Sequence, residues 1–71
     1  GVLVFRKQQL SAVAAELERF YWAGIRFADP ALGDILITTT LMNVTLPDAL
    51  DIIAITAGVK VSVRDGSVLI E

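Results

Sequence analysis

Eight carboxylates are the main side chains of this 71-residue chain that could transfer protons or bind a cation. Asp29 and Asp34 flank one short segment, and their oxygens are ligands that a hard cation accepts. They lack the closely alternating oxygen ligands of a dedicated calcium loop, so we expect no metal site there. Four others have structural explanations on a helix surface, at a helix start or in a turn: Glu16, Glu18, Asp48 and Asp65.

Nucleophilic catalysis also lacks its usual residues. The chain contains no histidine and no cysteine, which excludes disulfides, Cys or His nucleophiles and zinc sites built on these residues. The serines, Ser11, Ser62 and Ser67, therefore have no histidine to activate them, and the chain has no glycine-rich phosphate loop. We expect a protein that is not an enzyme and that has no catalytic, cofactor-binding or metal-binding residues.

Composition limits the other classes of function. Hydrophobic residues make up 55% of the chain and the net charge is −2, which fits one small domain with an aliphatic core. A general nucleic-acid binder needs a clustered positive surface instead. The longest uncharged stretch, 35–47, is interrupted by Thr and Asn and ends in proline, so the sequence predicts neither a membrane span nor a signal peptide. Because the chain opens inside an expected strand, we expect 1–71 to be a single domain of a longer protein.

The first half of the chain predicts a strand, a helix and a second strand. Val2–Phe5 is a short apolar run, typical of a buried strand. The next apolar residues recur at helical spacing and share one face: Leu10, Val13, Ala14, Leu17, Phe20 and Tyr21. Glu16 and Arg19 face away from this stripe and can pair on the surface. Gly24 is expected to end the helix in the left-handed conformation, ahead of a short strand.

The second half predicts a loop, three strands and one more helix. The loop covers 29–33, which contains both Pro and Gly. The strands cover 35–44, 59–64 and 67–70, and an Asp65-Gly66 turn joins the last two in a hairpin. Thr45 is expected to cap the helix, with Asp48 reaching back to the cap, and Gly58 is expected to end it.

The two halves match each other at a constant spacing of 36 residues. Four apolar positions of the first helix, Leu10, Val13, Ala14 and Leu17, align with Leu46, Ala49, Leu50 and Ile53. Each helix is followed by a glycine and an apolar–basic–apolar strand, and we expect the second helix to be two residues shorter. A duplicated strand–helix–strand unit is the simplest interpretation; chance similarity between two amphipathic helices is the alternative.

The second helix is apolar around much of its circumference. Ile52 lies beside the inner stripe, and Ile55 projects to the opposite side, between Asp48 and Asp51. Such a helix is usually covered on more than one side. We therefore predict an α+β fold in which two helices are sandwiched between two small sheets. The alternative is that Ile55 belongs to a partner-binding patch.

Two features are candidates for binding another protein. Trp22 points away from the apolar stripe if the helix reaches it, and an exposed Trp is a favoured interface anchor. Alternatively, the helix frays and Trp22 folds over the following loop. The strand over 35–44 carries no charge that would block the addition of a partner strand to its edge. The predicted partner-binding residues are therefore Trp22, Leu36, Thr38, Thr40 and Met42.

Three segments resemble the C-terminal periplasmic part of FecR-like anti-sigma regulators: 3–5 (LVF), 9–20 (QLSAVAAELERF) and 25–32 (IRFADPAL). That part is related to the short signalling domain called STN, which is found also in secretins and TonB-dependent receptors. The resemblance extends to the Asp48-Ala49-Leu50 helix and the closing hairpin, and so covers nearly the whole chain. Relatives often have Gly in the middle of the strand where this chain has Thr39, so a bulge expected there is in doubt.

The resemblance implies a single STN-like signalling domain with its helices between two small sheets. It also implies a role in a regulator anchored in the bacterial inner membrane, whose cytoplasmic end controls an extracytoplasmic-function (ECF) sigma factor. The periplasmic end of such a regulator contacts the N-terminal signalling domain of an outer-membrane TonB-dependent receptor, often one that imports an iron–siderophore complex. This chain is thus expected to be the periplasmic, receptor-facing interaction module, with no catalytic residue and no cofactor.

Two other functions fit the same sequence features. The chain could be the STN domain of a TonB-dependent receptor or of a secretin, which has the same fold on the other side of the contact. It could also be a small structural or ligand-binding domain unrelated to signalling. A filled apolar pocket would support this last alternative.

Overall fold

The computed structural model describes all residues, 1–71. The elements follow in the order β1 (Val2–Gln9), α1 (Leu10–Tyr21), β2 (Gly24–Phe27), the 3-10 helix η1 (Pro30–Asp34), β3 (Leu36–Met42), α2 (Leu46–Ala57), β4 (Val61–Arg64) and β5 (Ser67–Ile70). Neither α1 nor α2 has the length and apolar character that a membrane crossing requires.

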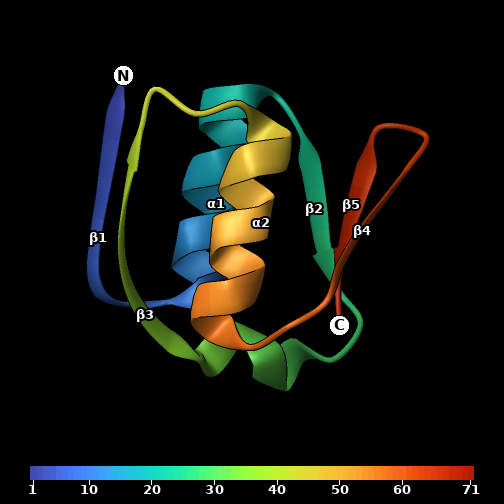
Figure 1. Ribbon diagram of the computed structural model, residues 1–71. Helices are drawn as coiled ribbons and strands as arrows, with labels where there is room; N and C mark the ends of the chain where they lie inside the picture. Colours follow the sequence, from blue (N-terminus) through green and yellow to red (C-terminus); the bar gives the residue numbers. More distant parts are fainter.

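The strands form two small sheets on opposite sides of the helices (Figure 1). Sheet A is the antiparallel pair β1–β3, and sheet B has the strand order β2–β5–β4. In sheet B, β5 is parallel to β2 and antiparallel to β4. The two helices run in opposite directions between the sheets, which confirms the predicted α+β sandwich.

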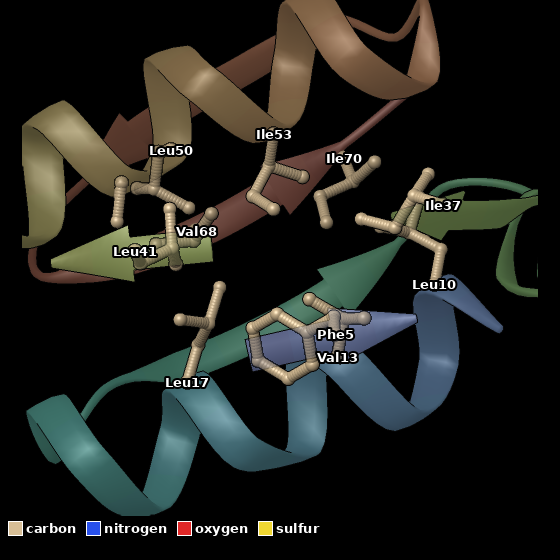
Figure 2. Close-up of a cluster of buried hydrophobic side chains, with 11 residues drawn as sticks. Phe5, Leu10, Val13, Leu17, Ile37, Leu41, Leu50, Ile53, Val68 and Ile70 are labelled. Carbon is tan, nitrogen blue, oxygen red and sulfur yellow. The ribbon is translucent and has the colours of Figure 1, made fainter. Parts of the chain in front are cut away.

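The core lies between the two helices and is closed by both sheets (Figure 2). Its buried apolar side chains form one cluster drawn from β1, α1, β3, α2 and β5: Phe5, Leu10, Val13, Leu17, Ile37, Leu41, Ala49, Leu50, Ile53, Val68 and Ile70. Burial of a large aliphatic side chain stabilises a fold by about 2 kcal/mol. Both strand–helix–strand units contribute to this single core, so neither unit could shield its apolar face alone.

The backbone of the helices repeats at the spacing found in the sequence. α1 and α2 each contain 12 residues, and each follows an extended residue, Gln9 or Thr45. Each helix is followed by a residue in the left-handed conformation, which is Trp22 (φ 57°, ψ 46°) after α1 and Gly58 (φ 71°, ψ 36°) after α2. These two residues are 36 positions apart, like the buried positions of the two helices. The structure therefore supports duplication over chance similarity.

Two predictions about the end of α1 are wrong. Gly24 does not end this helix; it is the first residue of β2 and pairs with Ser67. The two helices also have the same length, so the expected difference of two residues is absent. Both errors arise because the nearest glycine was taken as the helix end, whereas Trp22 adopts the conformation that glycine usually supplies.

The two helices begin differently. Thr45 caps α2 as predicted: its Oγ1 accepts a hydrogen bond from the Asp48 N–H at 3.4 Å, although the Asp48 side chain does not bond back to the cap. Gln9, at the equivalent position before α1, makes no side-chain cap hydrogen bond. Instead, the Leu10 N–H donates to the Ile35 carbonyl at 2.7 Å, so the start of α1 depends on a tertiary contact.

The chain between β2 and β3 is more regular than predicted. The segment expected to be a loop contains the 3-10 helix η1, with Pro30 in its first turn. The Asp29 carboxylate accepts a hydrogen bond from the Ala31 N–H at 2.9 Å and caps this helix. Asp29 therefore has a structural role, as a helix cap.

Strand β1 extends to Gln9, well past the predicted end at Phe5, because it continues through a bulge. The register with β3 shifts between Phe5 and Gln8, and the Lys7 N–H donates to Thr38 Oγ1 at 2.9 Å. Strand β3 is continuous through Thr39. The irregularity of sheet A therefore lies in β1 and not at Thr39 of β3.

The closing hairpin has the predicted turn. Asp65 and Gly66 both have positive φ, 54° and 77°, which is the signature of a type I′ turn. The strand before the turn is shorter than expected, because β4 begins at Val61 rather than at Val59. The register of β4 with β5 is regular from Val61–Ile70 to Arg64–Ser67.

Candidate functional site

The polar and charged side chains of the domain lie at its surface. No group of three or more potential metal-ligating side chains comes together in the chain. One ion pair is present, between Arg19 and Glu16, on the exposed face of α1 as predicted. No polar side chain is buried. The strongest candidate site is therefore a surface that can contact another molecule, and sheet A provides one.

The outer face of sheet A combines apolar and polar side chains. Strand alternation turns Phe5, Ile37 and Leu41 into the core and leaves the intervening side chains outside. The exposed residues of the two strands are Val2, Val4 and 6–9 from β1 and Leu36, Thr38, Thr40 and Met42 from β3. Val2 lies opposite Met42, and Val4 lies opposite Thr40. The four residues of this strand predicted to bind a partner thus share one exposed face.

The main chain of β3 has a free edge. Sheet A contains two strands, so one side of β3 has no strand partner. The Asn43 N–H donates to the Gly1 carbonyl at 2.9 Å, and in an antiparallel ladder every second residue makes such bonds. The N–H and C=O groups of Thr38, Thr40 and Met42 consequently point to the open side. Each of these three residues therefore combines an exposed side chain with main-chain groups that have no strand partner.

Sheet A is also cationic. Its strands contain Arg6 and Lys7 and no acidic residue, although the whole chain has a net charge of −2. Both cations are exposed and lie in the bulge opposite Thr38. Lys7 has a φ of 47°, which is uncommon for a residue other than glycine. This surface favours an extended, apolar partner segment that carries negative charge.

Trp22 follows α1 and is 94% exposed, so it does not fold over the following loop. With Glu18 and Arg19 it lines a shallow hollow of about 390 Å³. The left-handed conformation costs a residue with a Cβ about 1–2 kcal/mol, and strain of this kind is often retained at functional positions. Trp22 therefore stays a candidate interface anchor.

Trp22 lies at the same end of the molecule as the end of β3. The neighbouring Tyr21 hydroxyl donates to the Val44 carbonyl at 2.7 Å. Phe20 lies against Gly1, where an added Cβ would be 3.1 Å from its ring. These contacts hold the end of α1 beside the end of sheet A, close in the chain to Met42. They do not place Trp22 in direct contact with the β3 residues.

The prediction that a second layer covers Ile55 is wrong, because this side chain is 84% exposed. The sheets cover two flanks of α2 and α1 faces a third, so one flank of α2 faces solvent. Asp48 and Asp51 are exposed on the same helix. A partner-binding patch at Ile55 is the alternative that this exposure leaves open.

Sequence reasoning missed Val2 and Val4 as surface residues. The run Val2–Phe5 was predicted to be buried, but within it only Phe5 is fully buried. An uninterrupted apolar run has no alternation from which to infer one exposed face. The pairing of Val2 with Met42, which reveals the outer face, comes from the fold. The positive φ of Lys7 likewise could not be predicted from its residue type.

Comparison with known proteins identifies relatives of the whole chain. Residues 2–70 match the family model described as FecR, C-terminal. Two crystal structures of a candidate anti-sigma factor from Parabacteroides distasonis are similar to this chain at TM-scores of 0.90 and 0.89, each with 24% sequence identity. The matches include 100% and 99% of this chain and 34% and 33% of those chains, so this chain spans about a third of their length. A comparison with curated proteins gives no match.

Proposed function

Because this chain belongs to the FecR C-terminal family, we propose that it is the protein-interaction module of a transmembrane anti-sigma regulator. In this role the domain lies in the periplasm, and its parent protein is anchored in the bacterial inner membrane. The domain binds the N-terminal signalling domain of an outer-membrane TonB-dependent receptor for an iron–siderophore complex. The parent regulator, in turn, controls an ECF sigma factor.

The family and the structural relatives support the regulator over its alternatives. The matching family model is that of FecR rather than of a receptor or secretin domain. The similar crystal structures are of a candidate anti-sigma factor. These findings favour the regulator side of the contact, and we set aside the STN domain of a receptor or a secretin.

The free edge of β3 is the observation that carries the proposed mode of binding. An extended partner strand can add to this edge through main-chain hydrogen bonds, which provide affinity, while alternate side chains provide specificity. The free main-chain groups belong to Thr38, Thr40 and Met42, and no acidic residue lies in either strand of sheet A. Leu36 and Met42 add exposed apolar surface at the two ends of the strand.

Trp22 extends the proposed interface beyond sheet A. Large aromatic residues are frequent anchors because they bury much area and lose little conformational freedom. Trp22 is 94% exposed and lies at the end of the molecule where β3 finishes. A partner strand that runs along β3 could therefore place a neighbouring part of its domain over Trp22.

Isothermal titration calorimetry tests this mode of binding. The titrant is the signalling domain of the cognate receptor. Thr40→Pro removes a main-chain donor on the open edge, and we expect it to weaken binding about tenfold. Thr40→Val is the matched control, because it keeps the N–H and suits a strand. Trp22→Ala should also weaken binding, by about tenfold if Trp22 is an anchor.

The outcomes separate binding from folding. Circular dichroism should show that Thr40→Pro keeps the wild-type secondary structure, because no hydrogen bond within sheet A is lost. Absence of a complex with the wild-type domain contradicts the proposed function. Equal affinities of Thr40→Pro and Thr40→Val contradict strand addition at β3, and in that case Val4→Pro shows whether β1 is the edge that binds.

A further inference from the structure

The outer face of sheet B contains a polar hollow that the proposed function does not use. Its volume is about 360 Å³, and its lining residues come from all three strands and the residue after β5: Arg26, Ser62, Arg64, Ser67, Leu69 and Glu71. Sheet B lies on the opposite side of the helices from sheet A (Figure 1). This hollow is therefore a surface separate from the free edge of β3.

The register of sheet B explains the hollow. One row across the outer face consists of Arg26, Leu69 and Ser62. The adjacent row consists of Gly24, Ser67 and Arg64. The two arginines thus stand on the two edge strands at opposite corners, with Leu69 and Ser67 of the middle strand between them. From the spacing of strands and residues in a sheet, the two arginine Cα atoms are about 12 Å apart. The two guanidinium groups can therefore reach one ligand between them.

Neither arginine is neutralised within the domain. The ion pair of the structure is Arg19–Glu16, on α1, so Arg26 and Arg64 pair with no carboxylate. Glu71 also lines the hollow but makes no ion pair. Lys60 is the residue before β4. It exchanges two main-chain hydrogen bonds with Glu71, at 2.8 and 2.9 Å. Three cations and one side-chain carboxylate leave this face positive in a chain whose net charge is −2.

We propose that this hollow binds a carboxylate-bearing segment of a partner protein. The planar guanidinium group is suited to carboxylates, with which it forms paired hydrogen bonds. The Ser62 and Ser67 hydroxyls can donate further hydrogen bonds to the same ligand. Leu69 lies between the arginines in the middle strand and offers an apolar contact to the aliphatic part of a Glu or Asp side chain. The proposed ligand is therefore an acidic peptide segment, bound on the side of the domain opposite sheet A.

Nuclear magnetic resonance of the arginine side chains tests this site without any receptor. The probe is an acetylated hexaglutamate peptide, titrated into the 15N-labelled protein at low ionic strength. We expect the Arg26 and Arg64 Nε–H signals to shift and to saturate together, while the Arg19 signal changes little. Arg64→Gln and Arg26→Gln should each weaken binding about fivefold, as for an exposed charge pair. Arg19→Gln is the matched control, because it removes the same charge from a different surface.

Each result supports or overturns the proposal. Saturable binding that Arg19→Gln preserves and Arg64→Gln weakens supports it. The proposal is overturned by the absence of a saturable shift, or by an equal loss of affinity in Arg19→Gln, which would indicate attraction to charge in general. A parallel titration with inorganic phosphate distinguishes the ligand: tighter binding of phosphate than of the peptide also overturns the proposal. Failure here leaves binding at β3 untouched, because the calorimetric experiment probes a different surface.

Discussion

The two strand–helix–strand units of this domain share a backbone but differ in the residues that maintain it. In both units a positive-φ residue precedes the helix by three positions, and a second one ends the helix. The second unit uses Asn43 and Gly58, residue types that adopt this conformation easily. The first unit uses Lys7 and Trp22, which do not. The two units therefore share these backbone conformations, but only the second unit has residue types that favour them.

This difference shows what holds each unit together. Helix α2 has a side-chain cap at Thr45 and a glycine at its end, so its limits are set locally. Helix α1 has no side-chain cap, and its first N–H donates to the Ile35 carbonyl, so its start depends on a tertiary contact. Its end is closed by local backbone hydrogen bonds to Glu18, as in α2, but at a residue that lacks the freedom of glycine. The two strained residues of the first unit are both exposed, and both lie at or beside the surface proposed to bind a partner.

The largest expected effects come from the core positions that the two units share. Leu17→Ala and Ile53→Ala remove equivalent, fully buried side chains, and each should lower the free energy of unfolding by about 3 kcal/mol. Urea unfolding followed by circular dichroism measures the change. Ile55→Ala is the control on the same helix as Ile53, and it should have almost no effect because Ile55 is 84% exposed. A small effect of only one core substitution would show that the units do not share the core equally.

Replacing the glycine that ends α2 should cause the next largest loss. Gly58→Ala places a Cβ on a residue with φ 71°, and we expect it to lower the free energy of unfolding by about 1 kcal/mol. No atom lies within 4 Å of the added Cβ, so the cost arises from backbone conformation alone. Gly58→Asn, measured in the same urea unfolding series, should lose less. Equal losses for Ala and Asn would contradict this explanation.

Replacing the residue before each helix should cost stability at α2 and almost none at α1. Thr45→Ala removes the hydrogen bond to the Asp48 N–H and should lower the stability by about 0.7 kcal/mol, in the lower part of the usual range because the bond is 3.4 Å long. Thr45→Ser should retain most of it. Gln9→Ala, at the equivalent position, removes no cap and should change the urea midpoint very little. A large loss for Gln9→Ala would show that α1 is capped after all.

The smallest expected effect is a gain in stability. Trp22→Gly relieves the left-handed strain at the end of α1 and should raise the free energy of unfolding by about 0.5 kcal/mol, after the extra entropy of the unfolded glycine is subtracted. Little packing is lost because Trp22 is 94% exposed. Trp22→Ala keeps the Cβ and should leave the stability almost unchanged. Destabilisation by Trp22→Gly, measured by thermal unfolding, would mean that the indole contributes packing that its exposure does not reveal.

Hydrophobic periodicity and turn chemistry were enough to predict most of the fold. The apolar spacing of both helices identified the positions that are buried, although Phe20, in the predicted stripe of α1, is 46% exposed. Thr45, Gly58 and the Asp65-Gly66 turn marked boundaries that the structure has.

Sequence reasoning failed where a residue adopts a backbone conformation that its type does not favour, as Lys7 and Trp22 do. Trp22 ends a helix that was expected to continue to Gly24. Strand β1 contains a bulge that cannot be predicted from the residue types around it.

The candidate site was predicted only in part. The alternation of β3 placed Leu36, Thr38, Thr40 and Met42 on one exposed face, but their role in binding is a proposal. The other half of that face, on β1, depends on pairing between strands more than 30 positions apart in the chain, as between Val4 and Thr40. The hollow of sheet B depends on three strands at once, so it could not be seen along the sequence.

Strand β5 is the last element of the chain but the middle strand of sheet B, and this order has a consequence for synthesis. A nascent chain can pair β1 with β3 once residue 42 has left the ribosome. Val68 and Ile70 are the last residues of the core to emerge, and until then one side of the core is open and β2 and β4 lack their common neighbour. Folding that depends on such distant pairing is slow, because the entropy of closing a long loop is lost before the contact forms. A ribosome-bound chain that stops before Ser67 should therefore remain unfolded and open to proteases.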